Sequence, residues 1–182
     1  MAPSKPPTNG TSTTAMQRKP LKILMLHGYT QSGPLFRAKT RALEKHLLKS
    51  FPGIHLTYPT APLHLSRSDI PNFDTSVETN ASFSNDSLRA DADDDKPDAW
   101  GWWRRKGSSE PYTYEGMEIG FSKIAQVLKS EGPFDGVIGF SQGAAAAGML
   151  ASLLEPGRRE AFEAAQGQGG MRYPESFEED SG

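Results

Sequence analysis

The sequence contains no cysteine in its 182 residues. This absence excludes disulfide bonds, thiolate metal sites and a cysteine nucleophile, but it leaves the redox compartment undetermined. No apolar run approaches the roughly 20 residues that a membrane-spanning helix needs. There is also no excess of basic residues, because the net charge is −2 and the pI is about 6.1. We therefore expect a soluble protein with no membrane span and no nucleic-acid partner.

Residues Met1–Lys19 offer little that a core could bury. They are rich in Pro, Ser and Thr, a composition typical of a disordered tail. They lack the apolar segment of a secretory signal. Three prolines and no amphipathic period disfavour a mitochondrial transit peptide, although no acidic residue precedes Glu44. We expect a cytoplasmic protein, with the nucleus as the alternative compartment.

A short strand, a G-x-S-x-G motif and an alanine-rich helix follow one another within Phe134–Leu154. This order is typical of a nucleophile elbow, in which a strained turn presents a serine hydroxyl above a sheet. Backbone crowds such a turn from both sides, so the positions two before and two after Ser141 must lack a Cβ atom. Both positions, Gly139 and Gly143, are glycine. The alternative is a glycine-rich turn that happens to contain a serine.

The chain before this motif predicts two more strands with a helix between them. The apolar run Leu21–His27 suits a buried parallel strand, and Ile54–Tyr58 suits a second. Pro34 suits a first helical turn. Apolar spacings of three and four then predict one buried face of a helix that runs through Ser50. The residues of this face are Phe36, Thr40, Leu43, Leu47 and Phe51.

Residues 61–111 show no sustained period, which predicts a lid, a binding loop or a disordered insertion, placed at about 64–99. The acidic run Asp91–Asp95 fails as a calcium loop, because Lys96 takes the glycine position and Trp102 the glutamate position. We interpret the run as solvated charge and predict no metal site. An amphipathic period then predicts a helix across Tyr112–Ser130.

Three tryptophans, Trp100, Trp102 and Trp103, lie close together before that helix. They suit the lining of an apolar acyl or aromatic pocket at the mouth of a site. They equally suit a staple that fastens the end of the insertion to the core. The sequence does not distinguish the two interpretations.

The order of elements predicts an α/β fold, with parallel strands joined by helical crossovers. Ligands in such sheets collect at the carboxyl ends of the strands. The loop after Leu21–His27 and the turn at Ser141 both lie at such ends. The backbone N–H groups of Tyr29 and Gln142 are therefore expected to converge beside Ser141, where they would stabilise a tetrahedral oxyanion.

Three segments together resemble the fungal serine hydrolases of the FSH family, which are α/β-hydrolases related to the ovarian-cancer-gene-2 esterase. They are Leu26–Gly33, Trp100–Trp103 and Gly132–Ala144, and the similarity runs from about Pro20 to about Tyr173. The resemblance implies a parallel sheet with flanking helices and the spatial strand order Ile54–Tyr58, Leu21–His27, Phe134–Phe140.

The same resemblance implies a chemistry and a set of site residues. The chemistry is hydrolysis of esters or thioesters of a small-molecule acyl substrate, without a cofactor. The implied nucleophile is Ser141, and the implied oxyanion-hole amides are those of Tyr29 and Gln142. Gly28 in the first loop joins Gly139 and Gly143 as a glycine of the site.

One requirement of this chemistry is missing from the sequence. A serine hydroxyl needs a base, and an acid must orient that base. In this fold the order along the chain is Ser, then Asp or Glu, then His. Asp180 is the only aspartate after Ser141. All four histidines precede Ser141: His27, His46, His55 and His64. We expect structural roles for His27, His46 and His55. The alternative is that His64 acts as a rearranged base.

We therefore expect residues 20–182 to be part of a serine hydrolase domain that lacks the C-terminal strands bearing the acid and the base. This chain alone should then be inactive. The strand Phe134–Phe140 would also lie at an unprotected sheet edge, which is an aggregation liability. The alternatives are a non-catalytic acyl-binding descendant or gene fragment, and a hydrolase that a partner chain completes. The oligomeric state and the acyl substrate stay open.

Overall fold

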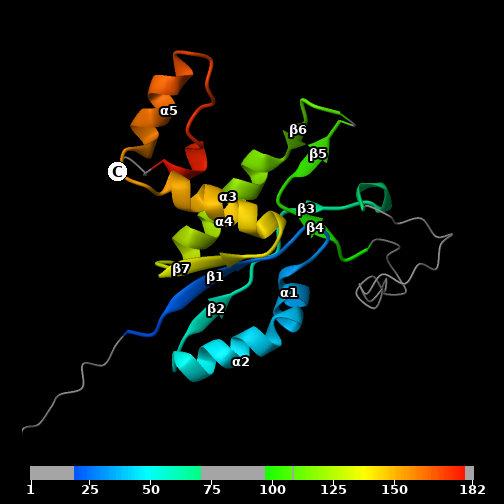
Figure 1. Cartoon of the computed structure of the whole chain (residues 1–182), viewed down its shortest axis with the longest axis vertical. Helices are drawn as coiled ribbons and strands as arrows, with labels where there is room; N and C mark the ends of the chain where they lie inside the picture. The colour runs from blue at the N-terminus through cyan, green and yellow to red at the C-terminus, as the bar shows by residue number, and fades with distance from the viewer. Residues whose placement is uncertain (1–18, 71–96, 108, 179–182) are drawn as a thin grey trace, which may run out of the picture.

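Three parallel strands form the centre of the fold in the computed structural model, which describes residues 19–70, 97–107 and 109–178 (Figure 1). The strands are β1 (Lys22–Leu26), β2 (His55–Thr57) and β7 (Gly136–Gly139), and they pair in the order β2-β1-β7. This pairing confirms the expected spatial order and the parallel direction. The expected tail before Lys19 lies outside the described residues.

The central strand β1 is buried on both faces, which explains its unbroken apolar sequence. Leu24, Met25 and Leu26 are fully buried, as expected for a parallel strand covered on both sides. Leu26 is level with Gly139 of β7. The loop after β1 and the turn after β7 therefore leave the same end of the sheet. Within the described residues, β2 and β7 are the two edges of the sheet, and for β7 this was expected.

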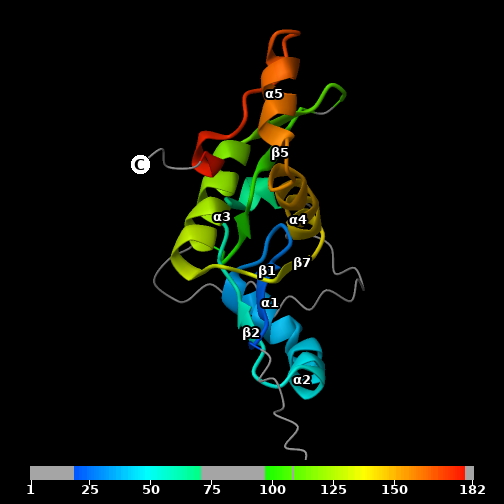
Figure 2. The same cartoon turned by 90° about the vertical axis from the view of Figure 1, so that its left-hand side faces the viewer.

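One face of the sheet carries α1 (Gly33–Lys39) and α2 (Arg41–Ser50), as Figure 2 shows. The prediction of one continuous helix was wrong, because the helix breaks at Thr40, whose hydroxyl donates to the Phe36 carbonyl at 2.8 Å. The expected buried face is also wrong for α2, which has no buried residue. Since β2 has only three residues, it offers α2 little surface to cover. The large apolar residues exposed on α2 and at its C-terminal cap are Leu43 (38%), Leu48 (45%) and Phe51 (48%).

The other face carries α3 (Met117–Glu131) and α4 (Gln142–Leu153) (Figure 2). Helix α3 begins later than expected, because residues 113–115 form strand β6 and Gly116, with φ 77°, leads into the helix. The buried face of α3 packs with α4 and two of the tryptophans into the main core. Its members include Trp102, Trp103, Phe121, Ile124 and Leu150.

Two small antiparallel ribbons occupy the region where the sequence shows no period. In one, β3 (Leu63–His64) pairs with β4 (Trp100–Gly101); in the other, β5 (Arg104–Lys106) pairs with β6 (Thr113–Glu115). Strands of two or three residues are too short to produce a visible alternation. A short 3₁₀ helix, η1 (Arg67–Asp69), follows β3. Most of the expected insertion, including the acidic run Asp91–Asp95, lies outside the described residues.

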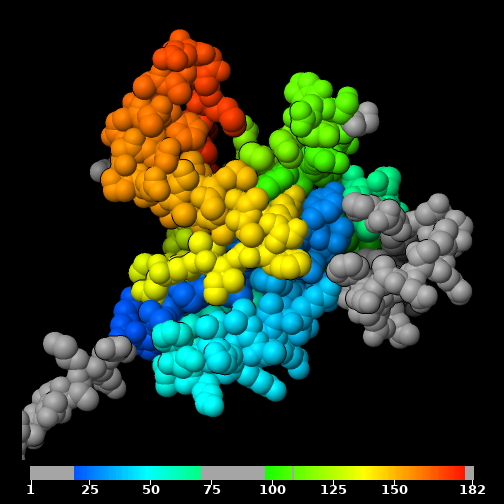
Figure 3. Space-filling view, viewed as in Figure 1, coloured from blue at the N-terminus to red at the C-terminus, as the bar shows by residue number. Residues whose placement is uncertain are grey.

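The C-terminal part folds back onto the α3–α4 layer. Helix α5 (Arg158–Gln166) projects from the body in Figure 3, and the 3₁₀ helix η3 (Glu175–Phe177) returns to α3. The Tyr173 hydroxyl donates to the Leu153 carbonyl at 2.9 Å, and the rings of Phe177 and Phe121 lie 6.2 Å apart. Asp180 lies outside the described residues. Among the helices that the structure does describe, none has the length and apolar character needed to cross a bilayer.

Candidate active site

Ser141 lies in the tight turn between β7 and α4, and it has φ 51° and ψ −116°. A non-glycine residue with positive φ is uncommon, and it persists only where the surrounding structure holds it. Ser141 is exposed to solvent. The turn therefore presents a hydroxyl at the carboxyl end of the sheet, on the N-terminal side of a twelve-residue helix.

Three glycines permit the close approach of backbone around this turn. A Cβ atom on Gly139 would lie closer than 3.0 Å to the Gly143 carbonyl, and one on Gly143 would lie equally close to the Leu26 carbonyl of β1. A Cβ atom on Gly28 would lie 2.9 Å from the Phe140 ring and 3.3 Å from Ser141 Cβ. For Gly139 and Gly143, this packing explains why the turn requires glycine. It also brings the first loop against the serine turn.

The backbone N–H groups of Tyr29 and Gln142 have no protein acceptor among the described residues. Gln142 is the first residue of α4, where an N–H group has no intrahelical partner. Tyr29 follows Gly28, where an added Cβ atom would lie 3.3 Å from Ser141 Cβ. These are the two donors expected to bind an oxyanion, and the helix dipole adds to their positive potential.

The His27 side chain is locked inside the first loop. Its Nε2 accepts from the Ala61 N–H at 2.9 Å, so its Nδ1 carries the proton and donates to the Gly28 carbonyl at 2.8 Å. The Trp102 indole N–H donates to the His27 carbonyl at 2.9 Å, and the two rings lie 5.2 Å apart. Both ring nitrogens are therefore occupied, and His27 shapes the loop that carries the Tyr29 N–H.

The stability of the fold should fall at acidic pH because of His27. Burial holds its pKa below the ordinary value, although the Gly28 hydrogen bond and Asp98 act in the opposite direction. Below about pH 6.5 the unfolded chain binds a proton that the folded chain does not. The free energy of unfolding should then drop by up to about 1.4 kcal/mol per pH unit until the folded pKa is reached. Urea unfolding between pH 5 and 8 measures this slope.

The matched control for this prediction is His55→Gln, at an exposed position of β2. His27→Gln should lower the stability at pH 8 and flatten the slope, whereas His55→Gln should leave the His27 contribution in place. An unchanged slope in His27→Gln would contradict the prediction.

The Gln142 side chain ties α4 to the tryptophan segment. Its Oε1 accepts from the Trp102 N–H and its Nε2 donates to the Trp103 carbonyl, both at 2.8 Å. Trp102 is fully buried and Trp103 stacks on Phe121 at 6.4 Å. Burial favours the staple interpretation for these two indoles over the pocket interpretation.

Trp100 has a different environment. Its indole N–H donates to Asp98 at 2.7 Å, and it is only half-buried. With Ser32, Thr60 and Lys123 it borders an open hollow of about 440 Å³. Of the three indoles, Trp100 is the one that the structure places at a hollow.

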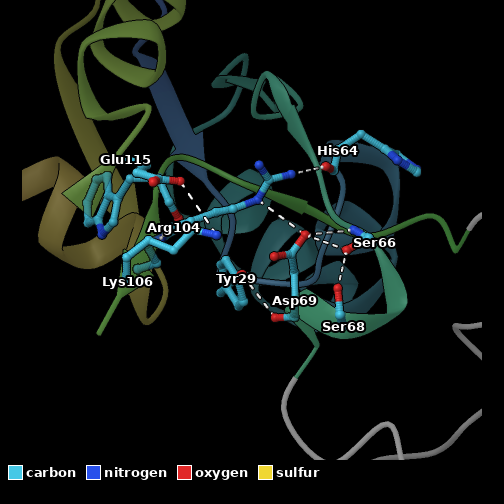
Figure 4. Close-up of polar contacts among 10 residues, drawn as sticks. Tyr29, His64, Ser66, Ser68, Asp69, Arg104, Lys106 and Glu115 are labelled. Atoms are coloured by element: carbon cyan, nitrogen blue, oxygen red, sulfur yellow. Dashed lines mark hydrogen bonds and ion pairs between the residues drawn. The ribbon is translucent and has the colours of Figure 1, made fainter. Parts of the chain in front are cut away.

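A polar network that the sequence analysis missed holds the Tyr29 side chain (Figure 4). The Tyr29 hydroxyl donates to the Asp69 carbonyl at 3.0 Å, and Arg104 Nε lies 3.3 Å from the Asp69 carboxylate. Arg104 also donates to the His64 carbonyl at 2.6 Å. Hydrogen bonds from Ser66 hold the pKa of Asp69 below its ordinary value, with Arg104 acting in the same direction. Burial, followed by the Asp69 charge, raises the pKa of Tyr29.

This network anchors the loop that carries the Tyr29 N–H to both small ribbons. Its one visible sequence signal is Ser66-x-x-Asp69, the spacing of a capping box. Sequence separation hides the rest, since Tyr29 and Asp69 are 40 positions apart.

The other histidines have separate positions. His46 lies on α2 and His55 on β2, as expected. The His64 ring forms a hydrogen bond with the Pro97 carbonyl at 2.9 Å and packs edge-on against Trp100. Within the described residues, no histidine or carboxylate forms a hydrogen bond with the Ser141 hydroxyl.

A protein-family model described as "Serine hydrolase (FSH1)" matches residues 16–174. "Dihydrofolate reductase" of Schizosaccharomyces pombe is 35% identical over 140 residues, which cover 77% of this chain and 28% of that protein. "Esterase OVCA2" of Danio rerio is 34% identical, and the match covers 77% of this chain and 59% of that protein. "Family of serine hydrolases 3" of Saccharomyces cerevisiae is 35% identical, and the match covers 71% of this chain and 46% of that protein. The chain spans less than two thirds of the length of each of these relatives.

Proposed function

The chain belongs to the serine hydrolase (FSH1) family, and from this premise we propose that Ser141 is the nucleophile of a hydrolase for acyl esters or thioesters. The observation that carries the proposal is the Ser141 turn, with its positive φ and the glycines that its packing requires. The name of the Danio rerio relative, an esterase, supports the reaction class.

In the proposed reaction, Ser141 Oγ attacks the acyl carbonyl carbon and its proton passes to a base. The carbonyl oxygen becomes an oxyanion, which the N–H groups of Tyr29 and Gln142 stabilise by hydrogen bonds. The tetrahedral intermediate collapses, the C–O or C–S bond breaks, and the base protonates the departing alcohol or thiol. Water then hydrolyses the acyl-enzyme by the same route. No step requires a cofactor.

We propose that the base and its orienting acid are not among the described residues. Neither nitrogen of the His27 ring is free, and the His64 ring contacts Pro97 and Trp100. Residues 20–182 are then part of a hydrolase domain with an insertion at about 64–99. We propose Trp100, the half-buried indole that borders a hollow, as the tryptophan that contacts an acyl substrate. The proposed compartment is the cytoplasm.

A second candidate is a protein that binds acyl compounds without turnover, or a gene fragment that retains the fold. The observation that favours it is the Ser141 hydroxyl itself, which has no base beside it in the described part of the chain. A third candidate, completion of the triad by a partner chain, predicts a co-purifying partner, and gel filtration of a lone monomer would exclude it.

The deciding experiment reads the 3′ end of the transcript from full-length cDNA and then labels the encoded product with a fluorophosphonate. If the frame continues into strands with an Asp and a His, the longer product should react and Ser141→Ala should abolish labelling. Ser122→Ala, at an exposed position of α3, should label as the wild type does. A longer product that stays unlabelled, or a Ser141→Ala variant that labels fully, would refute the catalytic proposal.

A further inference from the structure

A second hollow lies between α1, α2 and strand β2, on the opposite face of the sheet from α4. It has a volume of about 720 Å³, which is within the range of small-molecule sites. It shares no lining residue with the serine turn or with the loop that carries the Tyr29 N–H. Pro34 is the one lining residue that it shares with the hollow at Trp100, so a ligand bound here would make contacts different from those of a substrate bound at Ser141.

The helical wall of this hollow carries an uncompensated positive charge. Arg37, Arg41 and Lys45 line it, with Glu44 as the only acidic residue of the lining. Glu44 is already paired with Arg37 at 3.0 Å. Arg41 and Lys45 form no ion pair within the described residues, although the whole chain has a net charge of −2. The hollow therefore has two cations available for an anion.

The remaining lining is apolar and lies close to these cations. Arg41, Lys45 and Leu48 are spaced by four and three residues, so they follow one another along a single face of α2. Leu56 and Tyr58 line the hollow from the strand side. Tyr58 is held in place by its hydroxyl, 3.3 Å from Thr40 Oγ1, and by an edge-on contact with Phe36.

We propose that this hollow binds an anionic amphiphile, with a carboxylate or phosphate head on Arg41 and Lys45 and an apolar chain against Leu48, Leu56 and Tyr58. The planar guanidinium of Arg41 suits either head group, because it offers paired N–H donors to two oxygens. The Lys45 ammonium adds a point charge. Burial of the chain against the apolar wall contributes in proportion to the area removed from water.

Calorimetric titration of the 182-residue protein with dodecanoate and with dodecyl phosphate, each below its micelle concentration, tests the proposal. At least one should bind, and the tighter one identifies the head group. Dodecanol and inorganic phosphate, which each lack one half of the ligand, should bind at least about tenfold more weakly. Ser141→Ala should bind as the wild type does, which separates this site from the proposed catalytic one.

The charge test uses two double variants of α1–α2 that remove the same charge. Arg41→Gln/Lys45→Gln should weaken binding at least about tenfold. Lys39→Gln/Lys49→Gln, at exposed positions outside the lining, should change it less than about twofold. If both double variants weakened binding equally, the ligand would be attracted to a basic surface in general, and the proposal would be overturned.

The apolar test compares two leucines of α2. Leu48→Ser should weaken binding, whereas Leu43→Ser, which is exposed but outside the lining, should not. All these side chains are exposed, so circular dichroism should show unchanged folding. Absence of binding by both probes to the folded wild type would overturn the proposal, as would tighter binding to anionic vesicles that neither Arg41→Gln/Lys45→Gln nor Leu48→Ser affects.

Discussion

Replacement of Gly143 by alanine should unfold the protein or leave it insoluble. The added methyl group would collide with the carbonyl oxygens of Leu26 and His27, which belong to the buried end of the central strand and the loop after it. Relief requires α4 to move away from β1, which would expose core residues such as Leu150. We expect a loss of about 4 kcal/mol or more, at the upper end for single substitutions and comparable to the whole stability of a small domain.

Gly148→Ala is the matched control, because it makes the same change on the same helix. A Cβ atom at Gly148 meets nothing within 4 Å. Alanine should therefore stabilise the helix by up to about 1 kcal/mol. Urea unfolding measures the free energy of unfolding of both variants, which should be lower than that of the wild type for Gly143→Ala and higher for Gly148→Ala. A soluble Gly143→Ala protein with the wild-type unfolding midpoint would contradict the packing described here.

The 182-residue chain alone should hydrolyse activated acyl esters roughly 10⁴-fold or more slowly than a serine hydrolase with a complete triad. The reason is the state of the hydroxyl: no described side chain accepts the Ser141 proton, and a neutral serine is a poor nucleophile. Initial rates with a nitrophenyl acyl ester, measured for the wild type and for Ser141→Ala, should agree within error.

Ester hydrolysis that disappears in Ser141→Ala would contradict this prediction and would show that the chain contains its own base. His64→Gln would then identify that base. If His64 acts as a rearranged base, the variant should lose the activity. If His64 only contacts Pro97 and Trp100, the activity should persist while stability falls.

The parallel strands and the serine turn could be predicted because their signals are local. A buried parallel strand has an unbroken apolar sequence, and β1 shows it. The serine turn requires glycine at fixed offsets, and Gly139 and Gly143 occupy those offsets. The strand order followed from the family resemblance, and the pairing of β1 with β2 and β7 confirms it.

Features that depend on distant partners could not be predicted. The period through Phe36 and Leu43 predicts an apolar face, but it does not show that the three-residue β2 leaves α2 largely uncovered. The sequence of the tryptophan segment is equally consistent with a pocket and a staple. It does not show that the Gln142 side chain forms hydrogen bonds with the backbone of this segment. The anchor of Tyr29 needs Asp69 and Arg104, which no local pattern connects.

The contacts described around the Ser141 turn all come from residues between Lys22 and Leu153. The backbone of β1, the first loop and the start of α4 enclose it, and the tryptophan segment clasps Gln142. The ribosome delivers the N-terminal part of a chain first. All the residues that make these contacts are therefore available once α4 has left the exit tunnel, before α5 has emerged. The surroundings of Ser141 are then complete early in the life of the nascent chain, whichever residues determine its reactivity.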